Sequence, residues 1–356
     1  MECRLIRDET QMEGLADGWR ALQARIGLAP FTDYDMARLW WQHIGKPSGA
    51  ALLVAACFDQ GKLVGVIPFS IRKKHGVRVL RLLGNEIFYY ANFLVANARV
   101  AESLWAAVLH DRSYDFANIK NIHNNTPEYA FFTTRFRVFR ASPAYYVAHS
   151  GRAREAVVAS LPKTLRRTIK RLDGAIAAGD GIEMGQTTTQ DIPEDVLAFL
   201  MNRKRGWAQE KGKTGIFDEA NSTALFEAMI HFTAARGAAV LFWLREAGRP
   251  VCATLGFIEK SVVYAHMVAF DQSAAKHSPG NYLTAQELIW ASENGYGETN
   301  FMEGHDDYKA AFTKTARITN EFIVSRSWLG KIYYLLYKGL SLYRYSKSKL
   351  RSHKDI

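Results

Sequence analysis

The residues best suited to chemistry lie between positions 261 and 312. Residues 261–270 form an apolar run of β-branched and aromatic side chains, which predicts a buried strand. A polar loop follows and ends at Pro279 and Gly280, after which residues 282–293 have helical spacing. Proline rigidifies such a turn, and glycine permits close approach of the backbone. The first N–H groups of a helix lack internal partners and its dipole favours negative charge there, so this turn predicts an anion-binding site.

The turn belongs to a longer series of spaced residues. In chain order these are Ser278-Pro-Gly280, Leu283, Gly295, Asn300-Phe301 and Gly304-x-x-x-Tyr308-Lys309. The series resembles the C-terminal half of a GNAT-superfamily acyltransferase, and more narrowly the CelD-like acyltransferases. Upstream, Gly248-Arg-Pro-Val-Cys-Ala253 and Leu165-Arg-Arg167 extend the resemblance, which covers residues 161–312 well and residues 1–160 more weakly. The CelD-like pattern has Asp where this chain has Asn300, which argues against a carboxylate role at that position.

The resemblance implies N-acyl transfer, in which an amine attacks the thioester of acyl-CoA or of an acyl carrier protein. Such a site holds the donor pyrophosphate, accepts a proton from the amine and stabilises the developing oxyanion. No metal is implied. The residues that it assigns to the donor phosphates are Lys276, His277, Ser278, Pro279, Gly280 and Asn281, with Lys309 as a further phosphate or oxyanion contact.

Catalytic roles also follow from the resemblance. His266 ranks first as general base because its strand borders the cleft in this superfamily, although a lone histidine in an apolar strand is more often a core residue. Glu303, His305 and Asp306 are the alternative bases, and the two carboxylates are also candidates to bind the acceptor as an ammonium ion. Tyr308 resembles the tyrosine that some relatives place near the leaving thiolate as general acid. The alternative for Tyr308 is a helix start packed on the sheet.

The two halves of the chain repeat one order of elements. Asp59-Gln-Gly61 and Glu246-Ala-Gly248 each join two apolar strands, which is a hairpin signal, and a helix and a strand follow in both halves. We therefore predict two copies of one α/β unit. The family resemblance implies that these are two tandem GNAT-like domains, as in the Fem-type transferases, each a mixed, mostly antiparallel sheet flanked by helices. Residues 1–160 are assigned to the acceptor side without catalysis, 161–326 to donor binding and catalysis, and 327–356 to a tail.

A basic helix is predicted to begin the second half. Its Lys and Arg residues recur at spacings of three and four between positions 163 and 171, which gives one basic face. A solvated helix surface is the ordinary interpretation of such a run, whereas the family resemblance places a basic helix beside the transfer site. The predicted acceptor contacts are Arg166, Arg167, Lys170 and Trp207.

Composition limits the remaining possibilities. The chain has 356 residues and a net charge of +11, which suggests an anionic partner. Its three cysteines lack C-x-x-C spacing, and Cys57 and Cys252 are predicted to be buried thiols, without a disulfide framework or a zinc site. The charged N-terminus does not resemble a signal peptide, and no apolar run approaches the ~20 residues of a membrane span. A cytoplasmic protein is expected.

The tail combines Tyr and Leu with Lys and Arg from position 328 to 354. It predicts a helix in the interface of an anionic membrane, on the inner face of the cytoplasmic membrane, or else a helix packed back on the domain. The first possibility favours a lipid-type amine acceptor, such as a long-chain sphingoid-like base. An amino sugar in exopolysaccharide biosynthesis, an aminoacyl-tRNA-dependent Fem-type reaction and a non-catalytic scaffold stay open. No DNA partner is expected, and the Ser-Pro-Gly motif disfavours tRNA.

Overall fold

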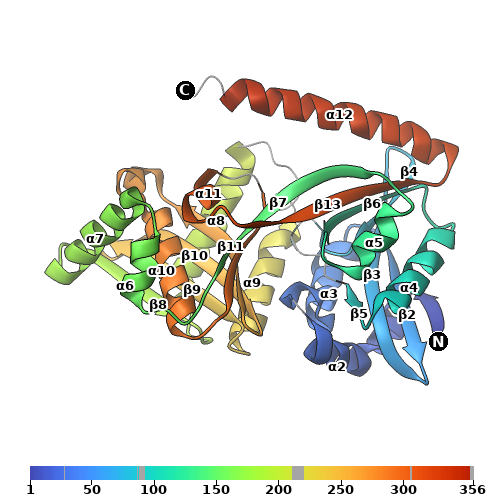
Figure 1. The fold of residues 1–356 in the computed structure, drawn as a ribbon, viewed down its shortest axis with the longest axis horizontal. Coiled ribbons are helices and arrows are strands. Elements are labelled where there is room, and N and C mark those ends of the chain that lie inside the picture. The colour runs from blue at the N-terminus through green and yellow to red at the C-terminus, as the bar shows by residue number, and fades with distance from the viewer. Residues whose placement is uncertain (28, 86, 88–92, 211–219, 305–306, 353–356) are drawn as a thin grey trace.

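The computed structural model describes residues 1–27, 29–85, 87, 93–210, 220–304 and 307–352, and one large twisted sheet runs through both halves (Figure 1). The first half supplies β1 (Glu2–Ile6), β2 (Ala51–Asp59), β3 (Lys62–Lys74), β4 (Val77–Leu82), β5 (Leu94–Val95), β6 (Phe116–His123) and β7 (Val138–Ala148). The second half supplies β8 (Ile182–Thr187), β9 (Ala239–Glu246), β10 (Arg249–Glu259), β11 (Val262–Phe270), β12 (Glu298–Glu303) and β13 (Ala316–Ser325).

The strand order is symmetric about the centre of the sheet. It reads β1-β2-β3-β4-β6-β13-β7-β12-β11-β10-β9-β8, with β5 beside β3. Each half forms an antiparallel meander of four strands and adds a fifth strand in parallel, β6 beside β4 and β12 beside β11. The last strands are then exchanged, because β13 pairs with β6 and β7 pairs with β12. The two exchanged strands pair antiparallel with each other and join the halves.

Helices cover both faces of the sheet. In the first half the connection from β1 to β2 contains α1 (Glu9–Glu13), α2 (Ala16–Ile26), a 3-10 turn η1 (Pro30–Thr32), α3 (Tyr34–Trp40) and a π-helical turn η2 (Trp41–Gly45), and α4 (Ala98–His110) and α5 (Pro127–Thr133) follow β5 and β6. The second half contains α6 (Arg154–Ser160), α7 (Lys163–Ala178), α8 (Glu194–Glu210), α9 (Ala220–Ala234), a 3-10 segment η3 (Gln272–His277), α10 (Pro279–Glu293) and α11 (Asp307–Phe312). This arrangement confirms the predicted mixed, mostly antiparallel α/β fold.

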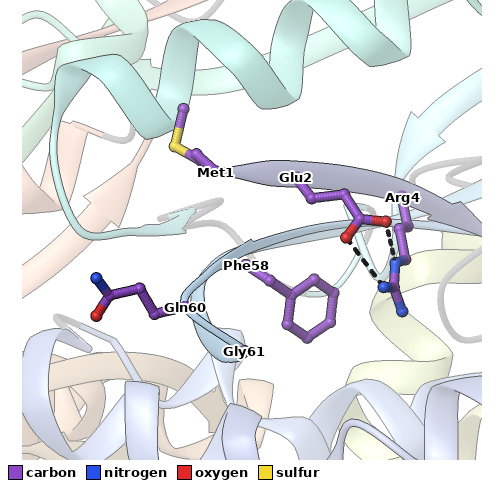
Figure 2. Close-up of a pocket in the computed structure, with 6 residues that line it drawn as sticks. All are labelled: Met1, Glu2, Arg4, Phe58, Gln60 and Gly61. Atoms are coloured by element: carbon purple, nitrogen blue, oxygen red, sulfur yellow. Dashed lines mark hydrogen bonds and ion pairs between the residues drawn. The ribbon is translucent and has the colours of Figure 1, made fainter.

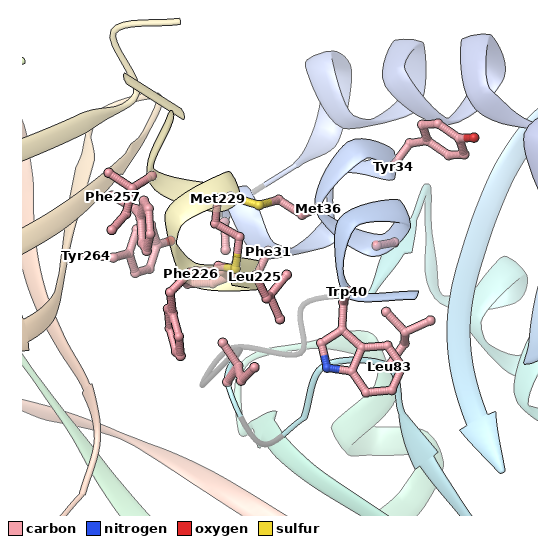
Figure 3. Close-up of a cluster of buried hydrophobic side chains, with 14 of the residues drawn as sticks. Phe31, Tyr34, Met36, Trp40, Leu83, Leu225, Phe226, Met229, Phe257 and Tyr264 are labelled. Atoms are coloured by element: carbon pink, nitrogen blue, oxygen red, sulfur yellow. The ribbon is translucent and has the colours of Figure 1, made fainter. Parts of the chain in front are cut away.

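One hydrophobic core is shared by the halves. Side chains of α2 and α3 pack with those of α8, α9 and β9 to β11 in a single buried cluster. Figure 3 shows its centre, where Phe31 and Met36 of the first half lie close to Phe226 and Met229 of the second. The ring centre of Phe31 is 5.6 Å from that of Phe257. Burial of this apolar surface fixes the halves against each other. Separate cores lie under α4 and α5 and under α6, α7 and α10.

The cysteine prediction is wrong in one respect. Cys3 and Cys57 lie directly opposite each other on β1 and β2 and form a disulfide, so Cys57 is not a free thiol. Their 54-residue separation conceals this pairing, which the register of the edge strand β1 alone determines. Cys252 is the predicted buried thiol, and burial raises its pKa.

The tail forms α12 (Trp328–Ser352), which crosses the outside of the central strands (Figure 1). Tyr333 packs on Phe116, with ring centres 4.9 Å apart. Gly330 is pressed against the backbone of Asp115, where a Cβ atom would clash with the carbonyl. Among the residues that the structure describes, no helix has the length and apolar character that a membrane span requires.

Candidate active site

The candidate site begins where β11 and β12 separate. The two strands pair in parallel only from Val262 and Glu298 to Tyr264 and Asn300, although both continue beyond that point. At the same level β11 has a bulge: Leu255 of β10 faces Met267, but Gly256 faces Ala265. His266 is therefore the extra residue of the bulge. Bulges change the direction of a side chain and are common beside active sites.

His266 projects into the core shared by the halves. Its imidazole centre lies 5.0 Å from Phe257, 5.6 Å from Phe31 and 6.1 Å from Phe226. Nε2 is 3.2 Å from the carbonyl oxygen of Ile87. Because a carbonyl only accepts, the proton of the neutral ring resides on Nε2, and Nδ1 is the basic nitrogen. Burial lowers the pKa of His266 to about 4; the Ile87 carbonyl opposes this and the Lys204 ammonium adds to it. The ring is neutral at pH 7.

The predicted anion-binding turn begins α10. Ser278 has a left-handed backbone with φ 51° and ψ 50°, and Pro279 is the first helical residue. The backbone N–H of Tyr282 donates to the Ser278 carbonyl at 3.1 Å, so the groups without an intrahelical acceptor belong to the residues before it. Gly280 faces the sheet: a Cβ atom there would lie 3.1 Å from Val268 Cγ1. This glycine thus allows the helix start to approach β11.

Several cations surround this turn. Arg171 of α7 donates from Nη2 to the His277 carbonyl at 2.8 Å, and Arg203 of α8 donates from Nε to the Phe270 carbonyl at 3.1 Å. Lys276 is exposed beside them. Neither arginine was assigned to the site from the sequence, although the spacing of Arg167 and Arg171 on one helix flank is a usable signal.

The predicted acceptor contacts divide between two helices. Arg166, Arg167 and Lys170 are exposed on α7, which packs beside α10. Trp207 is 39% exposed on α8. The Lys204 ammonium lies 5.5 Å from the centre of the Trp207 ring and acts electrostatically on His266. Lys204 was not singled out from the sequence.

Asn300 has a structural reason to be an amide. Its Oδ1 accepts from the backbone N–H of Met302 at 2.9 Å and so supports the left-handed backbone of that residue, with φ 59°. Its Nδ2 donates to Glu298 Oε1 at 2.8 Å, and Glu298 also accepts two bonds of 2.6 Å from Arg317. An aspartate cannot donate to Glu298 and would repel it. Asparagine in place of the CelD-like aspartate therefore suits a position beside the Glu298–Arg317 ion pair.

The remaining predicted residues lie at the end of β12 and in α11. Lys309 is 5% exposed, and its ammonium donates to the Glu303 carbonyl at 3.0 Å, which ties α11 to β12 rather than pointing to solvent. Glu303 is half-buried, and Tyr308 is 37% exposed. His305 and Asp306 lie outside the described residues.

A surface pocket elsewhere does not contain these groups. It has a volume of about 420 Å³ and lies at the β1 edge of the sheet, far in strand order from β11, lined by Met1, Glu2, Arg4, Phe58, Gln60 and Gly61 (Figure 2). Its charged groups, Arg4 and Glu2, are hydrogen-bonded to each other at 2.7 and 3.0 Å. None of the predicted site residues that the structure describes lines this pocket, so it is not the candidate site.

The candidate site falls within a recognised domain. Residues 147–310 match the family model of an acetyltransferase (GNAT) domain, a range that extends from the end of β7 into α11. The strand separation, the turn and α10 all lie inside it. The match and the fold identify a GNAT-type domain in this part of the chain. The CelD-like subgroup remains a prediction.

Solved structures share the architecture across most of the chain. FemX has a TM-score of 0.58 at 12% identity, covering 84% of this chain and 93% of that one. A tandem GNAT protein from the clavulanic acid biosynthesis pathway has a TM-score of 0.53 at 13% identity, covering 91% and 98%. L-PGS from Bacillus licheniformis has a TM-score of 0.52 at 12% identity, covering 94% and 96%. These likenesses confirm the tandem GNAT fold. A comparison with curated proteins found no significant match.

Proposed function

We propose that the protein is an N-acyltransferase that moves an acyl group from acyl-CoA or an acyl carrier protein to an amine. The observation that carries this proposal is the turn at the start of α10, ringed by Lys276, Arg171 and Arg203, beside the strand separation that contains His266. Helix N-termini and fixed cations bind phosphates. The domains are proposed as residues 1–160, 161–326 and 327–356, with catalysis in the second.

In the proposed reaction the donor phosphates bind residues 276–281 and the thioester enters between β11 and β12. The amine nitrogen bonds to the carbonyl carbon, its proton passes to Nδ1 of His266, and the carbon–sulfur bond breaks. Tyr308 gives its proton to the leaving thiolate, and proton exchange with solvent restores both groups. Glu303, His305 and Asp306 are the alternative proton acceptors. Phe31 and Ile87, which contact His266 from the first half, support an acceptor-side role for that half.

The donor class is tested by thermal unfolding with ligands. Binding to the native state alone raises the melting temperature. Coenzyme A or an acyl-CoA is expected to raise it, whereas uncharged and aminoacylated tRNA are not. A rise with aminoacyl-tRNA alone would favour the Fem-type reaction, and no rise with any ligand would favour a scaffold without catalysis.

Replacing Tyr308 by phenylalanine is expected to lower turnover by about 10²-fold, the lower range of general acid catalysis. The ring is partly exposed and phenylalanine keeps it, so the fold should persist, which the melting temperature checks. Thioesters of more acidic thiols need less protonation, so the defect should shrink with such donors. Tyr129→Phe, at a partly buried position in the first half, is the matched control. A defect equal for all donors would exclude the acid role.

We further propose that α12 places the site at a membrane. Its inner side is satisfied: the Tyr337 hydroxyl donates to Glu321 Oε1 at 2.7 Å and accepts from Asn118 Nδ2 at 2.8 Å. On its other side α12 carries large apolar side chains that are 49% to 69% exposed, namely Trp328, Ile332, Leu335, Leu336, Leu340, Leu342 and Tyr343. The helix therefore packs on the domain, which is one of the two sequence-based alternatives, and it also exposes an apolar surface. Exposed apolar surfaces of this kind mark interaction sites.

An anionic membrane is the partner that suits this surface. The α12 sequence has six Lys or Arg residues and no acidic residue. Each basic residue near an anionic surface contributes about 1 kcal/mol, and apolar side chains insert at the headgroup boundary. A peripheral position on the inner face of the cytoplasmic membrane favours a lipid-type amine such as a sphingoid-like base. The amino sugar is the alternative acceptor, and the shared fold does not choose between them.

The membrane proposal is tested on the full chain, because truncation before α12 would expose Phe116. Leu335→Glu with Leu340→Glu is expected to lower binding to vesicles containing phosphatidylserine at least about tenfold, since apolar insertion is lost and repulsion gained. High salt should also weaken wild-type binding. Gln60→Glu with Gln272→Glu adds the same charge at exposed sites elsewhere and should have little effect. Equal vesicle binding by all three proteins, or a dimer lost only in the leucine variant, would reject the membrane.

A further inference from the structure

The bulge that carries His266 has a buried carboxyl group behind it. We infer that Glu287 is a positioning residue that, as an uncharged acid, supports the bulge and thereby the orientation of His266. The catalytic consequence rests on the proposed function, whereas the structural effect on His266 does not.

Gly256 fixes the location of this carboxyl group. A Cβ atom at Gly256 would lie 2.6 Å from Glu287 Oε1, so the glycine leaves the space that the carboxyl group occupies. Gly256 is also the residue at which the β10 partner changes from Met267 to Ala265, omitting His266. Glu287 thus lies over the point where the bulge begins.

The carboxyl group and the imidazole are on opposite faces of the sheet. Ala265 and Val263 pack into the core beneath α10, which is the Glu287 side. His266 contacts Phe31 and Phe257 in the core shared by the halves. If the Glu287 carboxyl group needed more space, it would therefore shift the pairing of β10 with β11. That shift would rotate the His266 side chain on the other face of the sheet.

The surroundings of Glu287 favour its neutral form. The side chain is 1% exposed, and within the described ranges its Oε1 has no hydrogen-bond partner. Val240 and Val263 border the same space at Gly256, and the buried polar groups of the two facing elements are uncharged: the hydroxyls of Thr254 and Thr284 and the thiol of Cys252. A carboxylate in such surroundings is costly.

The charged groups that other elements bring to α10 are already paired. Arg154 of α6 and Asp173 of α7 lie 2.7 Å apart and also bond to Gln286 and Tyr282 of α10. Neither shifts Glu287, because burial is the whole cause that raises its pKa to about 8. The acid form therefore predominates at neutral pH.

The raised pKa of Glu287 determines how the stability of the protein changes with pH. Glu287 ionises near 4.5 in the unfolded chain and near 8 in the native protein. Its contribution to stability is thus complete below pH 4.5, declines as the pH rises, and is lost above about 8. Glutamine has the shape of the neutral acid and does not ionise, so Glu287→Gln removes this dependence.

Two measurements test the inference, with Glu293→Gln at an exposed position of the same helix as control. The melting temperature of the wild type, relative to Glu287→Gln, should fall from pH 5 to 8.5 and then level, and the control should follow the wild type. The His266 imidazole signals, assigned by their loss in His266→Gln, should shift between pH 7 and 9.5 in the wild type and the control but not in Glu287→Gln.

Each outcome separates the inference from the proposed function. The positioning role of Glu287 would be overturned if the melting temperatures of the wild type and Glu287→Gln changed equally with pH. It would also be overturned if the His266 signals of the wild type did not shift with pH. If Glu287→Gln does not fold, the wild-type imidazole shift still decides. Absence of acyl transfer in every protein, together with the expected melting and imidazole results, would reject the proposed function and keep the positioning role.

Discussion

Replacing His266 by glutamine is expected to lower acyl-transfer turnover by about 10²–10⁴-fold, the usual contribution of a general base. Glutamine fills much of the space among Phe31, Phe226 and Phe257, and its amide can still donate to the Ile87 carbonyl, so the fold should persist. What it lacks is a basic nitrogen in place of Nδ1. The measurement is single-turnover transfer from a saturating acyl-CoA, which separates the chemical step from donor binding.

The pH dependence of turnover is a second test of His266 as the general base. Transfer requires the neutral imidazole, and the pKa of His266 is lowered to about 4, so activity should persist at pH 5.5 and decline only as the pH approaches 4. His149 is the matched control: it is half-buried just after the end of β7, its Nε2 lies 2.8 Å from Thr299 Oγ1, and burial likewise lowers its pKa. Full turnover in His266→Gln would transfer the role to Glu303, His305, Asp306 or water.

Reversing two charges at the donor turn should weaken coenzyme A binding by about 10²-fold or more. Arg171→Glu with Lys276→Glu places two carboxylates where the phosphates are proposed to bind. Hydrogen bonds to charged groups contribute about 1.5–3 kcal/mol each, and 1.4 kcal/mol is about a tenfold change in affinity. Calorimetry with coenzyme A and with dephospho-coenzyme A measures the effect and shows which phosphate is involved.

The control for this double variant carries the same charge change in the first half, at the exposed residues Lys62 and Arg112. Lys62→Glu with Arg112→Glu should bind coenzyme A as the wild type does. Unchanged affinity in the Arg171 and Lys276 variant would remove the donor from this turn. A bulky residue at Gly280 is a poorer experiment, because the glycine faces Val268 and Phe270, and the side chain would disturb the helix start itself.

The part of the site that is local in sequence could be predicted. The apolar run at 261–270, the proline–glycine turn and the helical spacing after it correspond to β11, the start of α10 and α10 itself. These features depend on periodicity and on the conformational limits of proline and glycine, which act over a few residues. The order of elements in the two halves was likewise sufficient to predict the duplicated fold.

Features that depend on pairing between distant segments could not be predicted. The disulfide of Cys3 and Cys57, the reach of Arg171 to His277 and the position of Lys204 near His266 all require the tertiary arrangement. The bulge at His266 is also hidden, because one extra residue does not disturb an apolar run that is already buried on both faces. Propensity and pattern describe single elements, whereas strand register comes from their packing.

The exchange of β7 and β13 has a consequence for how the protein is made. The partner of β6 is β13, so the N-terminal half cannot close its sheet when its own last strand leaves the ribosome. It must wait, with an open strand edge, until nearly all of the C-terminal half has been synthesised. Domains that fold independently during translation avoid such a delay, and an open edge invites pairing with other chains. A nascent chain arrested before residue 316 should therefore depend on chaperones, and neither half should be stable when expressed alone.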